Sequence, residues 1–163
     1  MPINELLAEL EKLPLNAQTE RWNEANGITG DESLKLLADY RLTDTPRRFS
    51  ERIAGLPEGE FQEVLALIIG HFPTKPYEST SYSRRVLCTV AVDAFMGRPQ
   101  KTDEARDLLL SALMTVKGYE LDIPTFDDFD SADRTEQVNN IDYLIKGVAG
   151  LDKGYVQPTQ QQF

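Results

Sequence analysis

The chain has 163 residues, of which 40% are apolar and 27% are charged, and this is enough material for one hydrophobic core. Its formal net charge of −10 repels phosphate backbones and anionic lipid surfaces, so we expect no nucleic acid and no membrane as a partner. The only cysteine, Cys88, excludes an intramolecular disulfide.

Apolar spacing predicts helices along nearly the whole chain. In the first part we expect Pro14 to end one helix, Asn26 and Gly27 to end a second, and Thr45 with Pro46 to begin a fourth. The expected ranges are 3–13, 17–25, 31–42 and 45–56.

The second part continues the helical pattern. Residues 81–96 are apolar on most sides, and their β-branched residues would also suit a strand, but their length and the lack of a partner strand favour a helix. We expect Gly118 to end the next helix and residues 119–130 to form an ordered loop. The expected helices here are 57–72, 81–96, 102–118 and 131–148.

These elements predict an all-α fold without a sheet, a compact bundle of about eight short helices with antiparallel or orthogonal neighbours. No linker is long enough to divide the chain, so we expect a single helical domain over residues 1–153 and a flexible C-terminal tail over 154–163. The start lacks a leader pattern, and the longest apolar run, Val64 to Ile69, is too short to cross a bilayer, which predicts a cytoplasmic protein.

Candidate catalytic and metal centres fail on ligand number or spacing. One histidine and one cysteine cannot build a zinc site, and the acidic run that begins at Asp127 lacks the glycine and the final glutamate of a calcium loop. Cys88 lies in an apolar stretch where a thiol stays protonated, and His71 fits a helix C-terminus. We therefore expect no metal, no cofactor and no catalytic residues, and we expect that the protein is not an enzyme.

The acidic groups gather at the two ends of the chain. Residues 1–40 carry a net charge of −5, residues 41–106 carry +1 and residues 107–163 carry −6. A basic protein is the natural partner for this charge, because opposite fields steer association. The alternative is that the acidity only keeps the protein soluble.

The densest acidic stretch also carries aromatic side chains, a combination typical of protein interfaces. The alternative is that the aromatic residues fill the core while the acids face solvent and cap the last helix. A second candidate, the loop 73–83 with its tyrosines and arginines, ranks lower. The predicted partner-binding residues are Glu120, Asp122, Phe126, Asp127, Asp128, Phe129, Asp130 and Asp133.

The leading hypothesis is a non-catalytic acidic protein that binds and masks a basic protein partner. One form of it is an inhibitor or immunity-type protein against a toxic nuclease, whose own cleft must be basic. The first alternative is a structural or regulatory helical subunit of a larger assembly. The second is a carboxylate-dependent enzyme that uses a divalent cation.

Overall fold

The computed structural model describes residues 3–23, 40, 42–74 and 82–150. In these ranges all regular structure is helical, which confirms the all-α prediction: six α-helices, one short 3-10 helix and no strand. The prediction of about eight helices is wrong in number for this part of the chain. The helix expected over 31–42 falls mostly outside the described residues, as do Asn26, Gly27 and the whole predicted tail.

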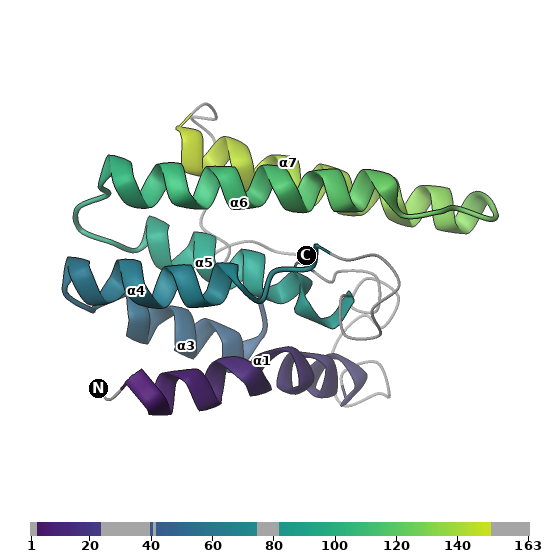
Figure 1. Cartoon of the computed structure of the whole chain (residues 1–163). Helices are drawn as coiled ribbons and strands as arrows, with labels where there is room; N and C mark the ends of the chain where they lie inside the picture. Colours follow the sequence, from purple (N-terminus) through teal and green to yellow (C-terminus); the bar gives the residue numbers. More distant parts are fainter. Residues whose placement is uncertain (1–2, 24–39, 41, 75–81, 151–163) are drawn as a thin grey trace.

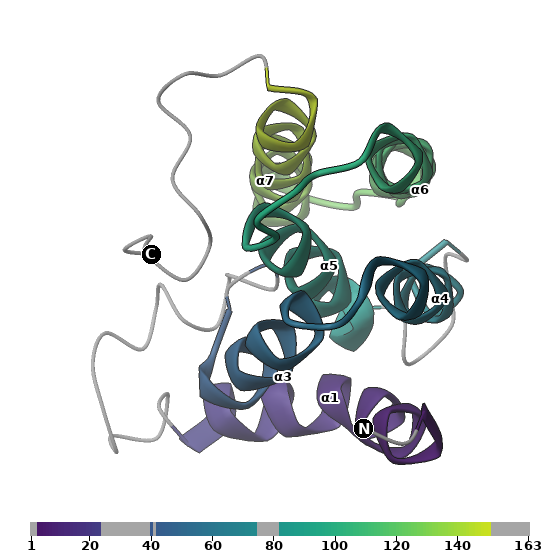
Figure 2. The same cartoon turned by 90° about the vertical axis from the view of Figure 1, so that its left-hand side faces the viewer.

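Helix α1 (Ile3–Asn23) passes through Pro14, where the sequence predicted an end. Leu6, Leu10, Leu13 and Ala17 are buried and continue one apolar face across the proline. Burying leucines on that face, at about 1.5–3 kcal/mol each, can offset the roughly 3 kcal/mol that an interior proline costs. Figure 2 shows α1 changing direction along its length, as expected for a helix with an interior proline.

Helices α3 (Asp44–Ala54) and α4 (Glu58–Ile69) are separated by a short turn. The residue before α3 is Thr43, not Thr45 as predicted. The backbone nitrogen and the hydroxyl group of Thr45 instead donate hydrogen bonds to Glu20 of α1. Helix α4 begins directly after Pro57, as expected.

Helix α5 (Val86–Met96) follows the 3-10 helix η2 (Tyr82–Arg85) and lies at the centre of the molecule. Its residues from Val86 to Phe95 are all buried, and it contacts each of the other five described α-helices. Figure 2 shows α5 between α6 and α7 on one side and α3 and α4 on the other. The choice of helix over strand for this segment is confirmed.

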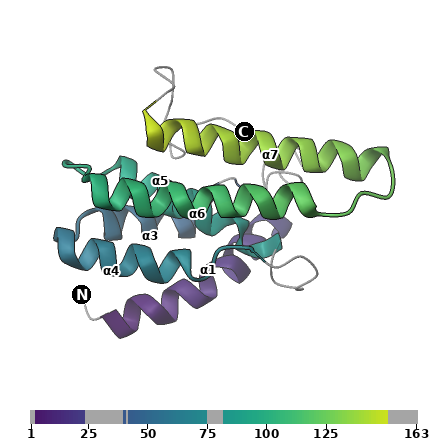
Figure 3. The same cartoon turned by 45° about the horizontal axis from the view of Figure 1, so that its top comes forward.

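Helices α6 (Asp103–Asp122) and α7 (Asp128–Ala149) form an antiparallel hairpin that extends past the other helices (Figures 1 and 3). The expected end of α6 at Gly118 is wrong, because Val116, Tyr119 and Glu120 are buried on either side of it and hold the helix in place. The compact bundle stays a prediction, since the hairpin projects from the body. Within the described ranges, no helix has the length and hydropathy that a bilayer span requires.

Candidate functional site

The projecting end of the α6–α7 hairpin carries exposed aromatic side chains. The side chain of Phe126 is 87% exposed and that of Phe129 is 65% exposed. Large apolar side chains are ordinarily withdrawn from water, so a projecting pair of phenylalanines is an unusual surface. Neither ring fills the core, and this excludes the alternative interpretation of these two residues.

Local sequence explains why the chain turns here. Pro124 disfavours helical backbone at the preceding residue, and Ile123 is accordingly extended, with φ −65° and ψ 124°. Helix α7 then starts at Asp128, and the amide of Ser131 donates to the carbonyl of Asp127 at 3.1 Å. The predicted loop over 119–130 thus shortens to residues 123–127.

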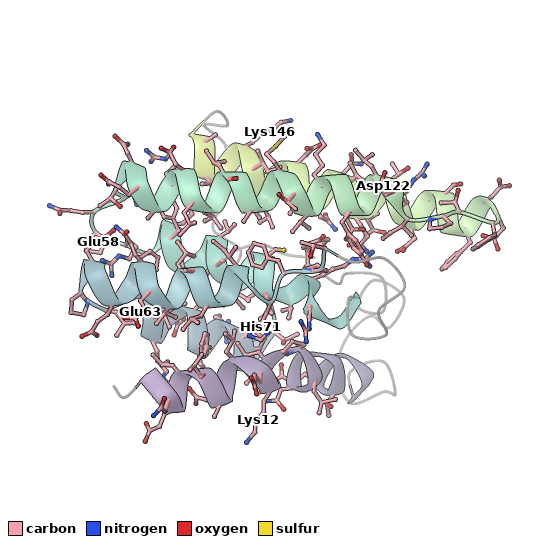
Figure 4. The ribbon with its side chains drawn as sticks, in the orientation of Figure 1. Lys12, Glu58, Glu63, His71, Asp122 and Lys146 are labelled. Carbon is pink, nitrogen blue, oxygen red and sulfur yellow. The ribbon has the colours of Figure 1, made fainter. Side chains whose placement is uncertain are left out.

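Acidic residues flank the two phenylalanines in the sequence. Asp122, Asp127 and Asp128 are exposed, and Figure 4 shows Asp122 near the projecting end of α6. Asp133 is half-buried, and Gln137 donates a hydrogen bond to its carboxylate at 3.4 Å. Asp130 belongs to the first turn of α7, but its side chain lies outside the described part of the structure. Carboxylates near the start of α7 also interact favourably with the helix dipole.

Glu120 lies apart from this group and is fully buried. Its carboxylate accepts hydrogen bonds from Arg85 and from Tyr40, so it holds the interior together and does not belong to the exposed surface. The signal in the sequence was its position: Val116 and Glu120 continue the apolar stripe of Leu109 and Leu113 at helical spacing. We define the acidic–aromatic tip as Asp122, Phe126, Asp127, Asp128 and Phe129.

Most of the lower-ranked candidate, the loop over residues 73–83, lies outside the described residues. Residues 75–81, which include Lys75 and Tyr77, lie outside the described residues. Arg84 is half-buried, and Arg85 is 1% exposed and committed to Glu120. Arg85 is thus not available at the surface.

The acidic run from Asp127 to Asp133 does not form a metal-binding loop, because nearly all of it belongs to α7. Helical backbone directs successive side chains around the axis and cannot wrap them around one ion. Over the described parts of the chain, no three acidic, histidine or cysteine residues are placed to hold a metal ion.

Cys88 is completely buried in α5. Burial, and secondly the nearby carboxylate of Glu120, raise the pKa of the thiol well above its usual value, so the thiol stays protonated. A protonated, buried thiol is a poor nucleophile and packs as a small apolar group.

No protein-family model, curated protein sequence or solved structure was found to match the chain. What the protein does must therefore be inferred from the placement and chemistry of its own residues.

Proposed function

We propose that the chain is an acidic helical binding protein whose acidic–aromatic tip docks on a basic protein partner. The observation that carries this proposal is the exposure of Phe126 and Phe129, 87% and 65%, at the end of a projecting hairpin. Exposed aromatic residues next to charges are the usual anchors of protein interfaces.

Each part of the tip has a separate energetic role. Covering one phenylalanine ring removes apolar surface from water and contributes about 1.5–3 kcal/mol. The carboxylates of Asp122, Asp127 and Asp128 select a cationic surface and accelerate encounter, an effect that salt weakens. The rings therefore supply most of the affinity and the acids most of the selectivity.

A projecting end fits a concave surface on the partner better than a flat one. The phosphate-binding cleft of a nuclease is concave and basic, so a nuclease toxin is a partner of the required chemistry. In that case the chain acts as an inhibitor or immunity-type protein that covers the cleft.

The test is affinity capture at low salt with the wild-type chain and the double variant F126A/F129A. We expect the wild type to retain a basic protein and the double variant to lose it. Both rings are exposed, so we expect the variant to remain within about 0.5 kcal/mol of the wild-type unfolding free energy. Leu15→Ala is the matched control, because Leu15 is an equally apolar side chain, 64% exposed, on α1.

Two results would overturn the proposal. One is capture of no basic protein by the wild type, and the other is capture that F126A/F129A leaves unchanged. A variant that neutralises Asp127 and Asp128 with asparagine separates the two contributions: we expect slower association and a weaker salt dependence. Tip-dependent self-association in light scattering would instead favour a subunit of a larger assembly.

A further inference from the structure

A groove runs between α1 and α3, with a cavity volume of about 380 Å³. Helix α1 lines it with Glu9, Lys12, Leu13 and Asn16. Helix α3 lines it with Thr45, Arg48, Phe49 and Arg52. In both helices the spacing is i, i+3, i+4 and i+7, which places each set on one helix face. Two regular helix faces therefore form the walls.

Polar contacts between the helices close the groove at both ends. At one end Arg52 Nη1 donates to Glu9 Oε1 at 2.8 Å. At the other end the backbone nitrogen of Thr45 donates to Glu20 Oε1 at 3.2 Å. Glu9, earlier in α1, pairs with Arg52, later in α3, and Glu20, later in α1, pairs with Thr45, earlier in α3. The two helices are therefore antiparallel here. The middle of the groove lies between the two contacts.

Two exposed cationic side chains, Lys12 and Arg48, line the groove, and neither has a partner of opposite charge among the described residues. Within the described residues, Lys12 and Arg48 form no ion pair and no side-chain hydrogen bond. They come from opposite walls, above a floor of Leu13 and Phe49, each 2% exposed. Two like charges that face one concavity repel each other unless an anion lies between them.

The charge of this groove is opposite to that of the whole molecule. Its lining holds three cations, Lys12, Arg48 and Arg52, against the single carboxylate of Glu9, whereas the chain carries a net charge of −10. Arg52 is bound to Glu9, and among the described residues Lys12 and Arg48 have no carboxylate partner of their own.

We propose that this groove binds a small organic anion, with a carboxylate or phosphate head between Lys12 and Arg48 and an apolar body on Leu13 and Phe49. The planar guanidinium of Arg48 can donate two parallel hydrogen bonds to such a head, and the ammonium of Lys12 adds a point charge. The amide of Asn16 supplies a further donor. The volume lies within the range of roughly 300 to 1,000 Å³ that is usual for small-molecule sites.

This site is independent of the acidic–aromatic tip. In Figure 2, α1 lies at the opposite end of the molecule from α7, and Figure 4 shows Lys12 and Lys146 on opposite sides. Loss of partner binding by F126A/F129A and loss of anion binding here are therefore distinguishable.

The test is a titration of the ¹⁵N-labelled full chain, followed by amide NMR shifts, with three probes: phenyl phosphate, phenylacetate and inorganic phosphate. We expect saturable shifts confined to α1 and α3, and tighter binding of the probes with a ring than of inorganic phosphate. Comparison of phenyl phosphate with phenylacetate shows which head the groove prefers. Absence of saturable shifts with any probe, or equal affinity for inorganic phosphate, would overturn the proposal.

Variants then assign the binding to the two cations. We expect Lys12→Gln to weaken the better-bound probe about tenfold, and K12Q/R48Q to weaken it by roughly another tenfold. Both side chains are exposed, so unfolding by urea should show nearly unchanged stability. Lys146→Gln removes the same charge from an exposed position on α7 and should leave the affinity unchanged. Equal effects of K12Q and K146Q would contradict the site.

Discussion

Arg85 and Glu120 are both withdrawn from solvent, and the guanidinium donates two parallel hydrogen bonds to the carboxylate. Nε lies 2.6 Å from Oε1, and Nη2 lies 2.7 Å from Oε2. The hydroxyl of Tyr40 donates to Oε1 at 2.7 Å, and Thr89 donates to the carbonyl of Tyr40 at 2.5 Å. These contacts connect η2, α5 and α6 with the segment that precedes α3.

We predict that Glu120→Gln lowers the free energy of unfolding by about 3–5 kcal/mol, because it leaves the charge of Arg85 buried without a counter-charge. Urea unfolding followed by circular dichroism measures this loss. Asp107→Asn is the matched control on the exposed face of α6, with an expected change below about 0.5 kcal/mol. The double variant R85M/E120L should be more stable than E120Q, since no unpaired charge remains. Equal stability of E120Q and D107N would contradict the prediction.

Apolar periodicity predicted most helices because burial and spacing agree in them. It failed at Pro14 and Gly118, two residues that favour helix ends when only neighbouring positions are considered. Both lie within helices whose apolar stripe continues on each side, through Ala17 in α1 and Tyr119 in α6. Tertiary packing overrides a local preference of a few kcal/mol, and packing is not visible in a short window of sequence.

The candidate surface was predictable in part. Aromatic residues among acids identified the segment, but composition alone could not separate Glu120, which is buried, from Asp127, which is exposed. The groove between α1 and α3 could not be predicted, because it depends on an antiparallel pairing of two helices and on which of its cations lack an ion-pair partner among the described residues. In the sequence Lys12 and Arg48 look like ordinary surface residues, and only the packing of α1 against α3 shows that they line the same groove.

The buried thiol of Cys88 can be used as a chemical probe of the opening of the core. Burial and the charge of Glu120 raise its pKa, so we predict that Ellman's reagent labels it at pH 8 only when the core opens. Labelling should be slow in buffer and rapid above the urea midpoint. E120Q should speed labelling in buffer, whereas D107N should not. Rapid, complete labelling of the native wild type would contradict the buried placement of Cys88.

The lowered pKa of Glu58 predicts that the free energy of unfolding depends on pH in the acidic range. Hydrogen bonds from Gln62 and Thr102, and then Arg98, lower the pKa of its carboxyl group. Because the pKa is lower in the folded state, the contribution of Glu58 is present above about pH 4.3, the ordinary value, and is lost as pH falls through the folded-state pKa.

We therefore predict that Glu58→Gln is less stable than the wild type at pH 7 and that the difference shrinks below about pH 4.3. Thermal unfolding across a pH series measures it. Glu60→Gln is the control, since Glu60 is exposed in the same helix turn. A difference that grows towards low pH would have the wrong sign and would contradict the role of Glu58.

Arg98 joins the turn after α3 to the start of α4. Its guanidinium donates to the carbonyl of Ala54 at 2.9 Å, to that of Leu56, and to Glu58 at 2.8 Å. It also lies 4.4 Å from the ring centre of Phe61. Helix-end carbonyls have no partner within their own helix, so an external donor satisfies them. An arginine fork can serve several acceptors at once because its donors are fixed in one plane.

We predict that Arg98→Lys lowers the free energy of unfolding by about 2 kcal/mol even though it keeps the positive charge, because one ammonium cannot reach all three acceptors and stack on the ring. Arg47→Lys, at an exposed arginine paired with Asp44, should change stability by less than about 0.5 kcal/mol. Urea unfolding at low salt and in 1 M NaCl separates the contribution of the hydrogen-bond geometry of Arg98 from the contribution of its charge. If Arg98 acts through its charge, R98K should resemble the wild type and high salt should weaken the wild type. If it acts through the fork, R98K should be destabilised to the same extent at both salt concentrations, since salt screens charges but supplies no hydrogen-bond donor to the carbonyls of Ala54 and Leu56.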